Sequence, residues 1–495
     1  MKVVVVGAGL GGLSAACHLA GRGHEVVVLE REPVPGGRAG LVEEAGYRID
    51  TGPSVFTMKS ILADTFAGAG ADIDDHLRFL PVDPMYRACF ADGSEIRVWH
   101  GREAMTQEIE STCGAPEAAS FGRFCDWLTD LYRLELPNFI DRNFDSVLDL
   151  ARPLRPVVTL MRTGGFRRLS AVVNAYFADT RLQRLFSFQS MYAGLSPFEA
   201  LAIYCVITYM DTVEGVFFPE GGMHAIPRGL AAAAEKAGAT FRYGVTVERV
   251  VCRAGHGSRA SGVALANGER VDADAVVLNP DLPVAYDELV PWVRAPRVAR
   301  RGRYSPSCAV WVAGVRGSLP PGAGHHNIHF GRAWEASFEA LMRQGECMPD
   351  PSMLVTSPTV SDPSLAPAGA ASMYVLEPTP NLDGRVDWKA RRERFREALV
   401  GRVAALGYPV DAVFERFYDP TDWERQGMAR GTPFSLAHTF FQTGPFRPNN
   451  VDKRLPGVVF VGSGTVPGVG VPIVLLSGRL AADRVDELAR ARPGA

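Results

Sequence analysis

The sequence lacks a long apolar run. No stretch of about 18 uninterrupted apolar residues occurs among its 495 residues, so we expect no membrane-spanning helix. It also begins directly with strand-forming residues rather than with a charged segment and a short apolar core, so no signal peptide is expected. These two absences predict a cytoplasmic protein, either free in solution or bound peripherally to the inner face of the cell membrane.

A strong charge of one sign and a cysteine framework are also missing. The formal net charge is only −3, which argues against nucleic acid as a partner. The eight cysteines are scattered, and no C-x-x-C pair or other metal-ligand spacing appears among them. They are expected to be free thiols in a reducing compartment, and the sequence predicts no metal site.

What the sequence does contain begins at its first residues. Four consecutive valines, at positions 3 to 6, leave no polar face and predict a strand that is buried on both sides. Gly7, Gly9 and Gly12 follow with the G-x-G-x-x-G spacing, and helix-forming residues come next. This order is typical of a dinucleotide-binding turn, in which the absent side chains let the backbone approach a pyrophosphate.

The following residues strengthen this interpretation. A second apolar strand ends in Glu30, about twenty residues after the glycines, where a carboxylate can hold the two hydroxyls of a ribose. Gly36, Gly37 and Arg38 then indicate another close backbone approach to phosphate, with a guanidinium to balance its charge. The alternative is a purely structural β-α-β unit that binds no nucleotide.

The last part of the chain repeats the strand-turn-helix pattern. An apolar run at residues 457–461 leads into a glycine-rich loop, and Pro472 stands where a helix would begin. The free N–H groups of that helix would face an electron-rich ligand atom. A ligand-free connection between strand and helix is the alternative.

Between these two ends the pattern changes twice. Helical patterns dominate residues 102–207, with amphipathic stretches at 103–113 and 115–132 and more apolar ones at 181–192 and 197–210. We therefore predict an α/β protein with a discontinuous nucleotide domain formed by residues 1–95, 215–285 and 445–495. Residues 96–214 would form a helical lid, and residues 286–444 a sheet-plus-helix substrate domain.

One segment of the predicted lid is both basic and apolar. Residues 151–173 contain five arginines and no acidic residue, with leucine, valine, methionine and phenylalanine between them. Such a segment is suited to an anionic membrane surface. A solvated helical face with its arginines extended into water is an equally good interpretation.

Several motifs together resemble the bacterial-type phytoene desaturases, and most closely their actinobacterial members. They lie at residues 51–54 (TGPS), 186–194 (FSFQSMYAG), 218–223 (FPEGGM), 325–331 (HHNIHFG), 442–449 (QTGPFRPN) and 461–468 (VGSGTVPG). The resemblance covers essentially the whole chain. It departs at Val466, where the family usually has histidine, and at Ile473, where it usually has glycine, so a role assigned to that histidine does not transfer.

The resemblance implies a two-dinucleotide-binding flavoprotein of the amine oxidase type, with noncovalent FAD and a membrane-facing helical lid. The pyrophosphate would lie on the first glycine turn, the ribose on Glu30, and Arg38 near the phosphates. The residues implied to bind FAD are Gly7, Ala8, Gly9, Gly11, Gly12, Leu13, Ser14, Glu30, Arg31, Gly36, Gly37, Arg38, Gly52, Pro53, Ser54, Val247, Gly462, Ser463, Gly470, Val471, Pro472 and Ile473.

The implied activity is desaturation of 15-cis-phytoene toward neurosporene or lycopene, with quinone or oxygen as electron acceptor. A hydrocarbon offers no acidic proton, so a hydride would pass to flavin N5 and a proton would leave separately. Candidates for the proton step are Asp149, Arg152 and Glu220, each of which is also explained as an ordinary structural residue. Alternatives are another flavin oxidase (carotenoid isomerase, oxygenase or amine oxidase) or a non-catalytic prenyl-lipid carrier.

Overall fold

A parallel sheet holds together parts of the chain that are distant in sequence. The computed structural model describes residues 1–150, 154–253 and 258–491. The sheet has five strands in the order β19-β13-β1-β2-β9, so the first strand is central and the last is at one edge. The strands are β1 (Lys2–Val6), β2 (Glu25–Leu29), β9 (Thr240–Arg242), β13 (Ala275–Leu278) and β19 (Val458–Phe460). The predicted discontinuous Rossmann-like sheet is thereby confirmed.

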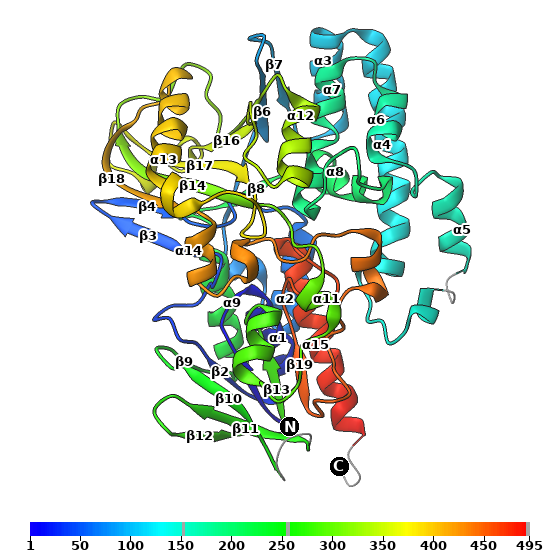
Figure 1. Cartoon of the computed structure of the whole chain (residues 1–495), viewed down its shortest axis with the longest axis vertical. Helices are drawn as coiled ribbons and strands as arrows, with labels where there is room; N and C mark the ends of the chain where they lie inside the picture. Colours follow the sequence, from blue (N-terminus) through cyan, green and yellow to red (C-terminus); the bar gives the residue numbers. More distant parts are fainter. Residues whose placement is uncertain (151–153, 254–257, 492–495) are drawn as a thin grey trace.

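The valines of β1 are buried on both faces, as their sequence predicts. Val3 and Val5 pack against a helical layer, whereas Val4 and Val6 pack against a three-stranded antiparallel sheet. The helices are α1 (Leu10–Gly21), α2 (Lys59–Gly68), α9 (Ala225–Lys236) and α15 (Val471–Arg490). The strands of the antiparallel sheet are β10 (Val247–Cys252), β11 (Ala260–Leu265) and β12 (Arg270–Asp272). Figure 1 shows this three-layered half with both chain ends at its lower edge.

A second, seven-stranded sheet lies above the first half in Figure 1, in the order β18-β14-β17-β16-β15-β6-β7. Helix α13 (Trp388–Ala405) packs on one of its faces through Phe395 and Leu399. A hairpin formed by β6 and β7 extends this sheet, because β6 is hydrogen-bonded to β15. The strands are β6 (Tyr86–Phe90), β7 (Glu95–Val98), β14 (Ser307–Arg316), β15 (His326–Phe330), β16 (Met353–Thr356), β17 (Ala370–Thr379) and β18 (Asp411–Tyr418).

The helical region stands beside this sheet, and α5 lies at its outer edge (Figure 1). Its helices are α3 (Arg102–Cys113), α4 (Ala115–Glu135), α5 (Leu154–Arg162), α6 (Leu169–Tyr176), α7 (Thr180–Leu185) and α8 (Cys205–Thr212). None of the helices in the described ranges is long and apolar enough to cross a membrane.

Two of the predicted helices are broken. The stretch 181–192 ends its α-helix at Leu185 and continues as a 3-10 turn, η4 (Phe188–Ala193), while 197–210 becomes α-helical only from Cys205. For the second stretch the reason lies in another part of the chain: the backbone of residues 200–203 bonds with residues 165–169, as in the 2.9 Å bonds from Leu169 N to Ala200 O and from Ala202 N to Arg167 O. These long-range bonds outweigh the local helix preference.

Short elements complete the connections between the two halves. The hairpin β3–β4 leads out of the second glycine turn, and β5 pairs with β8 where the chain re-enters the nucleotide half. The remaining strands and α-helices are β3 (Leu41–Glu44), β4 (Tyr47–Asp50), β5 (Phe79–Pro81), β8 (Phe217–Pro219), α10 (Leu282–Val284), α11 (Arg297–Arg301), α12 (Trp334–Glu339) and α14 (Pro420–Arg425).

Candidate active site

A cavity of about 1650 Å³ joins the two halves of the molecule. At one end it is lined by the glycine turns after β1 and β2, and at the other by the seven-stranded sheet and the helical region. The cavity passes under the glycine-rich loop between β19 and α15. A ligand at the nucleotide end and a second ligand at the sheet end would therefore share one space.

The turn after β1 is shaped by missing side chains. A Cβ placed on Gly9 would meet Asn279 Nδ2 at 2.7 Å, and one on Gly37 would meet Gly9 Cα at 3.1 Å. Gly9 forms the N-cap of α1, and no side chain bonds to that helix end. The first turn of α1 therefore keeps free N–H groups beside the cavity, which is the arrangement that binds a pyrophosphate.

Glu30 lies at the end of β2 and lines the cavity although it is only 6% exposed. Its Oε2 accepts a 2.6 Å hydrogen bond from Ala8 N, and its Oε1 accepts one of 2.9 Å from Glu32 N. Each carboxylate oxygen has a second lone pair. The residue is therefore fixed in place and still able to accept hydroxyl groups from a ribose.

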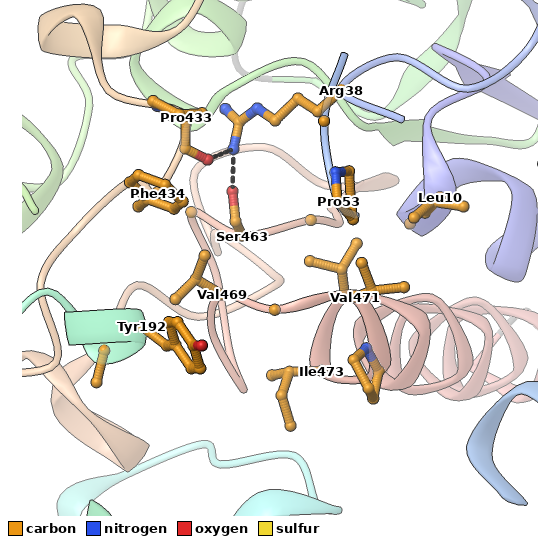
Figure 2. Close-up of a pocket in the computed structure, with 18 of the residues that line it drawn as sticks. Leu10, Arg38, Pro53, Tyr192, Pro433, Phe434, Ser463, Val469, Val471 and Ile473 are labelled. Atoms are coloured by element: carbon orange, nitrogen blue, oxygen red, sulfur yellow. Dashed lines mark hydrogen bonds between the residues drawn. The ribbon is translucent and has the colours of Figure 1, made fainter. Parts of the chain in front are cut away.

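The side chain of Arg38, which is predicted to lie near the phosphates, bonds to groups of three other segments. Its Nη1 donates to Ser463 Oγ at 2.7 Å and to Pro433 O at 2.8 Å, and its Nη2 pairs with the buried Asp281 at 3.3 Å. Figure 2 shows the guanidinium extended toward Ser463 and away from Leu10 at the start of α1. Arg38 thus ties the second glycine turn to the last loop of the chain.

Most of the residues predicted to bind cofactor line this cavity. Four lie behind its wall: Ala8 donates to Glu30, Gly12 packs against Gly7 O, Leu13 is in the core, and Ser14 Oγ donates to Leu475 O at 2.6 Å. Those on the wall are Gly7, Gly9, Gly11, Glu30, Arg31, Gly36, Gly37, Arg38, Gly52, Pro53, Ser54, Val247, Gly462, Ser463, Gly470, Val471, Pro472 and Ile473.

The last loop meets the cavity as α15 begins. Gly470 is the N-cap of α15 with φ +112°, and Pro472 is in its first turn, as the sequence predicts. Within the loop, Val469 N–H donates to Nε2 of His438 at 3.3 Å. Burial holds the pKa of His438 well below its ordinary value, so its imidazole is neutral and can accept this bond. A Cβ on Gly468 would collide with the same ring.

Beyond the loop the wall becomes aromatic and aliphatic. Phe188 makes edge contacts with Tyr86, Tyr192 and Phe330 at centroid distances of 6.1, 5.8 and 5.7 Å. Trp334 packs against Phe330 at 5.7 Å. This lining offers few polar groups to a ligand and favours a hydrocarbon.

Two buried carboxyl groups interrupt the apolar wall, and neither was among the sequence candidates. Burial raises the pKa of Asp211 to about 7 and that of Glu135 well above its ordinary value. Within the described part of the chain, Glu135 Oε1 has no hydrogen-bond partner. Isolated acidic residues on helices give no sequence pattern that distinguishes these two from surface ones.

Of the three residues predicted for the proton step, the structure describes two, and neither is part of the cavity wall. Asp149 Oδ2 accepts hydrogen bonds from Asp145 N and Ser146 N at a turn, and Glu220 forms a half-exposed ion pair with Arg78 at 3.4 Å. Neither lines the cavity. Arg152 lies outside the described residues.

Comparison with known proteins decides the family. The model of the flavin containing amine oxidoreductases matches residues 10–486, which is almost the whole chain. The chain belongs to this family. It is therefore a flavoprotein and an FAD-dependent oxidoreductase.

Two relatives and one solved structure show how similar this chain is to known proteins. The phytoene dehydrogenase of Streptomyces griseus is 48% identical over 489 residues, which cover 98% of this chain and 94% of the relative. The zeta-carotene-forming phytoene desaturase of Myxococcus xanthus is 37% identical over 500 residues, or 99% of this chain and 95% of the relative. A solved oxidoreductase of Methanosarcina mazei has a TM-score of 0.61 at 18% identity, covering 98% of this chain and 100% of its own, and so shares the fold.

The residues at the nucleotide end fit the flavin cofactor of this family. The space above Gly9 and Gly37 would be filled by any side chain, Glu30 presents a fixed acceptor, and the first turn of α1 has unbonded N–H groups. The N-terminal turn of α15 also lines the cavity, and within the described residues no side chain caps it. A dinucleotide can therefore contact the first turns of both α1 and α15.

Proposed function

We propose that this protein is an FAD-dependent carotenoid desaturase that converts 15-cis-phytoene toward neurosporene or lycopene. One observation carries the proposal: a dinucleotide cradle and a long apolar space form a single cavity of about 1650 Å³. The names of the full-length relatives in Streptomyces and Myxococcus support the substrate class. The product assay described below measures the number of double bonds introduced.

In this proposal, one end of the cavity binds FAD and the other end binds the hydrocarbon. We place the FAD pyrophosphate over Gly9 and Gly11, its ribose at Glu30 and its adenine beside the backbone of Val247. The isoalloxazine ring would lie against the loop from Gly462 to Ile473. When bound, the oxidised flavin supplies an acceptor for a hydride, and quinone or oxygen would afterwards reoxidise the cofactor.

The chain's own contribution to this reaction is binding, orientation and exclusion of water. A hydrocarbon offers no group for hydrogen bonding, so its position depends on shape and apolar contact with Phe188, Phe330 and Trp334. The same contacts keep water away from the reacting carbon atoms. Arg38 and His438 fix the loop that would cover the ring.

We further propose that the cavity opens onto a membrane surface. Leu148, Leu154, Met161 and Phe440 line the cavity and are also exposed, Leu148 to 75% and Leu154 to 64%. Phe441, 71% exposed, lies beside Phe440. An apolar rim around a cavity entrance would let a hydrocarbon pass from lipid without crossing water. Arg155 and Arg162 of α5 would then contact anionic headgroups, and the protein would lie on the inner face of the cell membrane.

The test is coexpression with a phytoene-producing pathway, followed by chromatography of the pigments. We expect coloured carotenoids whose spectra report how far the conjugation extends. Purified holoenzyme with phytoene liposomes and a quinone, without oxygen, should form the same products. Unchanged phytoene with fully loaded FAD would contradict the proposal, and oxidation of an added amine would favour an amine oxidase instead. Failure to retain FAD at all would favour a lipid carrier.

A further inference from the structure

The apolar part of the cavity contains a polar cluster that the steps described above do not use. Asp211, on α8, is 6% exposed and lines the cavity. Gln189 Nε2 donates to its Oδ2 at 3.5 Å, and Thr212 Oγ1 donates to its Oδ1 at 3.4 Å. Tyr86 and Tyr192 face the same carboxyl group. Residues from β6, η4 and α8 therefore converge on one acid in a wall that is mostly apolar.

The cluster lies close to the loop that would cover the flavin ring. Figure 2 shows Tyr192 beside Val469 and Ile473, on the opposite side of the opening from Arg38. The Tyr192 side chain is exposed only because the cavity reaches it: the residue lines the cavity wall and packs edge-on against Phe188 at 5.8 Å. A substrate that passes the loop would therefore lie along Tyr192 and the rings next to it.

We propose that Asp211 is the catalytic base that takes up the proton lost from the substrate, an inference that rests on the proposed desaturation. The first hydrogen leaves with both electrons of its C–H bond, and an allylic cation remains on the hydrocarbon. A neighbouring C–H bond then gives its proton to the Asp211 carboxylate, and the two electrons of that bond become the new C=C bond. The resulting carboxylic acid returns its proton to solvent before the next turnover.

The surroundings of Asp211 suit both parts of this task. Its negative charge and the faces of Phe188 and Tyr192 favour a cation in the cavity. Burial raises the pKa of Asp211 to about 7, against the smaller opposing effect of Gln189, Tyr86 and Thr212, so that a large fraction is ionised at neutral pH. A base with a pKa near the working pH both accepts and releases protons efficiently.

Glu135, the other buried acid of the cavity, is less suited. Within the described residues no donor bonds to its Oε1, and burial raises its pKa well above the ordinary value. Helix α4, which carries Glu135, packs along α8, where Tyr132 stacks on Tyr209 at 4.3 Å and Glu135 approaches Cys205. The titratable groups that face Asp211 are the phenols of Tyr86 and Tyr192, and burial raises the pKa of both.

The decisive variant is Asp211→Asn, which keeps the shape and removes the base. In the holoenzyme with phytoene liposomes we expect the desaturation rate to fall by about 10²-fold or more. The wild-type rate should rise about tenfold per pH unit below pH 7 and level off above it, whereas the variant should show no such rise. Asp211→Glu should restore the pH dependence. Glu214→Gln, an acid three residues further along that does not line the cavity, is the matched control.

A second readout does not depend on activity. Infrared titration of the holoenzyme without substrate should show a protonated carboxyl band that disappears between about pH 6 and pH 8, and this band should be missing in Asp211→Asn. FAD content and thermal midpoint should equal those of the wild type. A variant that retains the wild-type rate and pH profile would overturn the proposal, as would loss of the pH dependence in Glu135→Gln instead. A wild-type enzyme inactive on phytoene at every pH would contradict the proposed function itself.

Discussion

At the scale of single residues, the nucleotide end of the cavity depends on absent side chains and on one fixed acid. Gly9 has an extended backbone, with φ −72° and ψ 169°, so an L-residue can occupy it without backbone strain. A side chain does not fit at this position, because a Cβ there would lie 2.7 Å from Asn279 Nδ2. Its glycine is therefore required by the close packing at the cradle rather than by the turn.

Gly9→Ala should consequently weaken FAD binding more than it affects the fold. Overpacking of this kind costs about 1–3 kcal/mol, which corresponds to roughly 10- to 100-fold in affinity. The measurement is FAD titration of the apoprotein by flavin fluorescence, with a thermal melt of each variant. Gly401→Ala is the control, because a Cβ at this exposed position of α13 meets nothing within 4 Å. Wild-type affinity in Gly9→Ala would show that the cradle has more room than the structure indicates.

At the scale of elements, a buried arginine also holds the last loop to the segment before it. Arg447 is 2% exposed, and burial lowers its pKa to about 10, so it is charged at neutral pH. Its Nε donates to Thr465 O at 3.0 Å, its Nη1 to Gln442 O at 3.2 Å, and its Nη2 to Ser463 O at 2.5 Å. The loop after β19 and the segment before it are thus joined through one guanidinium.

Replacing Arg447 with Met should leave several buried carbonyl groups without a donor. Since one such group costs about 1–3 kcal/mol, we expect the free energy of unfolding to fall by about 3 kcal/mol or more. Urea unfolding monitored by circular dichroism measures this change. Arg249→Met removes an exposed arginine that pairs with the exposed Glu248, and it should change stability by less than about 1 kcal/mol. Equal effects of the two substitutions would contradict the role given to Arg447.

Helix α5 is the element on which the membrane proposal depends. Leu154 and Met161 are both more than 60% exposed and both line the cavity entrance. Leu154→Glu combined with Met161→Glu should weaken sedimentation with anionic vesicles by roughly tenfold or more, because two apolar side chains lose their contact with lipid. Val413→Glu, at an exposed site on β18 away from the cavity, should not. Unchanged vesicle binding of the double variant would leave α5 as a solvated helix.

At the scale of the whole molecule, the nucleotide half is built from the two ends of the chain. Helices α1 and α15 pack against each other, and a Cβ on Gly478 would lie 2.5 Å from the Cβ of Ser14. Residues of the first turn and of the last loop line the same cavity although more than 400 positions separate them. A cofactor bound there should therefore stabilise both ends at once.

Removal of FAD tests this coupling. Returning FAD at 100 times its Kd should stabilise the folded protein by about 2.7 kcal/mol. Hydrogen exchange, followed by mass spectrometry, should slow together in the segments 9–13 and 462–473 when FAD is added. Helix α13, on the far face of the seven-stranded sheet, should exchange at the same rate in both states. Protection confined to the N-terminal segment would mean that the loop before α15 does not contact the cofactor.

The sequence by itself determined the features whose cause is local. The buried strand at residues 2–6 follows from four adjacent valines, the glycine turn from its spacing, and the start of α15 from Pro472. The family resemblance added FAD and the expected activity, because the motifs that carry it are short and can be recognised in the sequence directly.

Only the tertiary structure decided which distant groups meet. It broke the helix expected at 197–210, since the backbone of residues 200–203 bonds to residues 165–169 instead. It turned Arg38 toward Ser463, and it brought Tyr86, Tyr192 and Asp211 together in the cavity wall. An acid on a helix has the same appearance in sequence whether it faces water or a ligand. Its reactivity depends on its burial and on its neighbours, and both are supplied by elements far away along the chain.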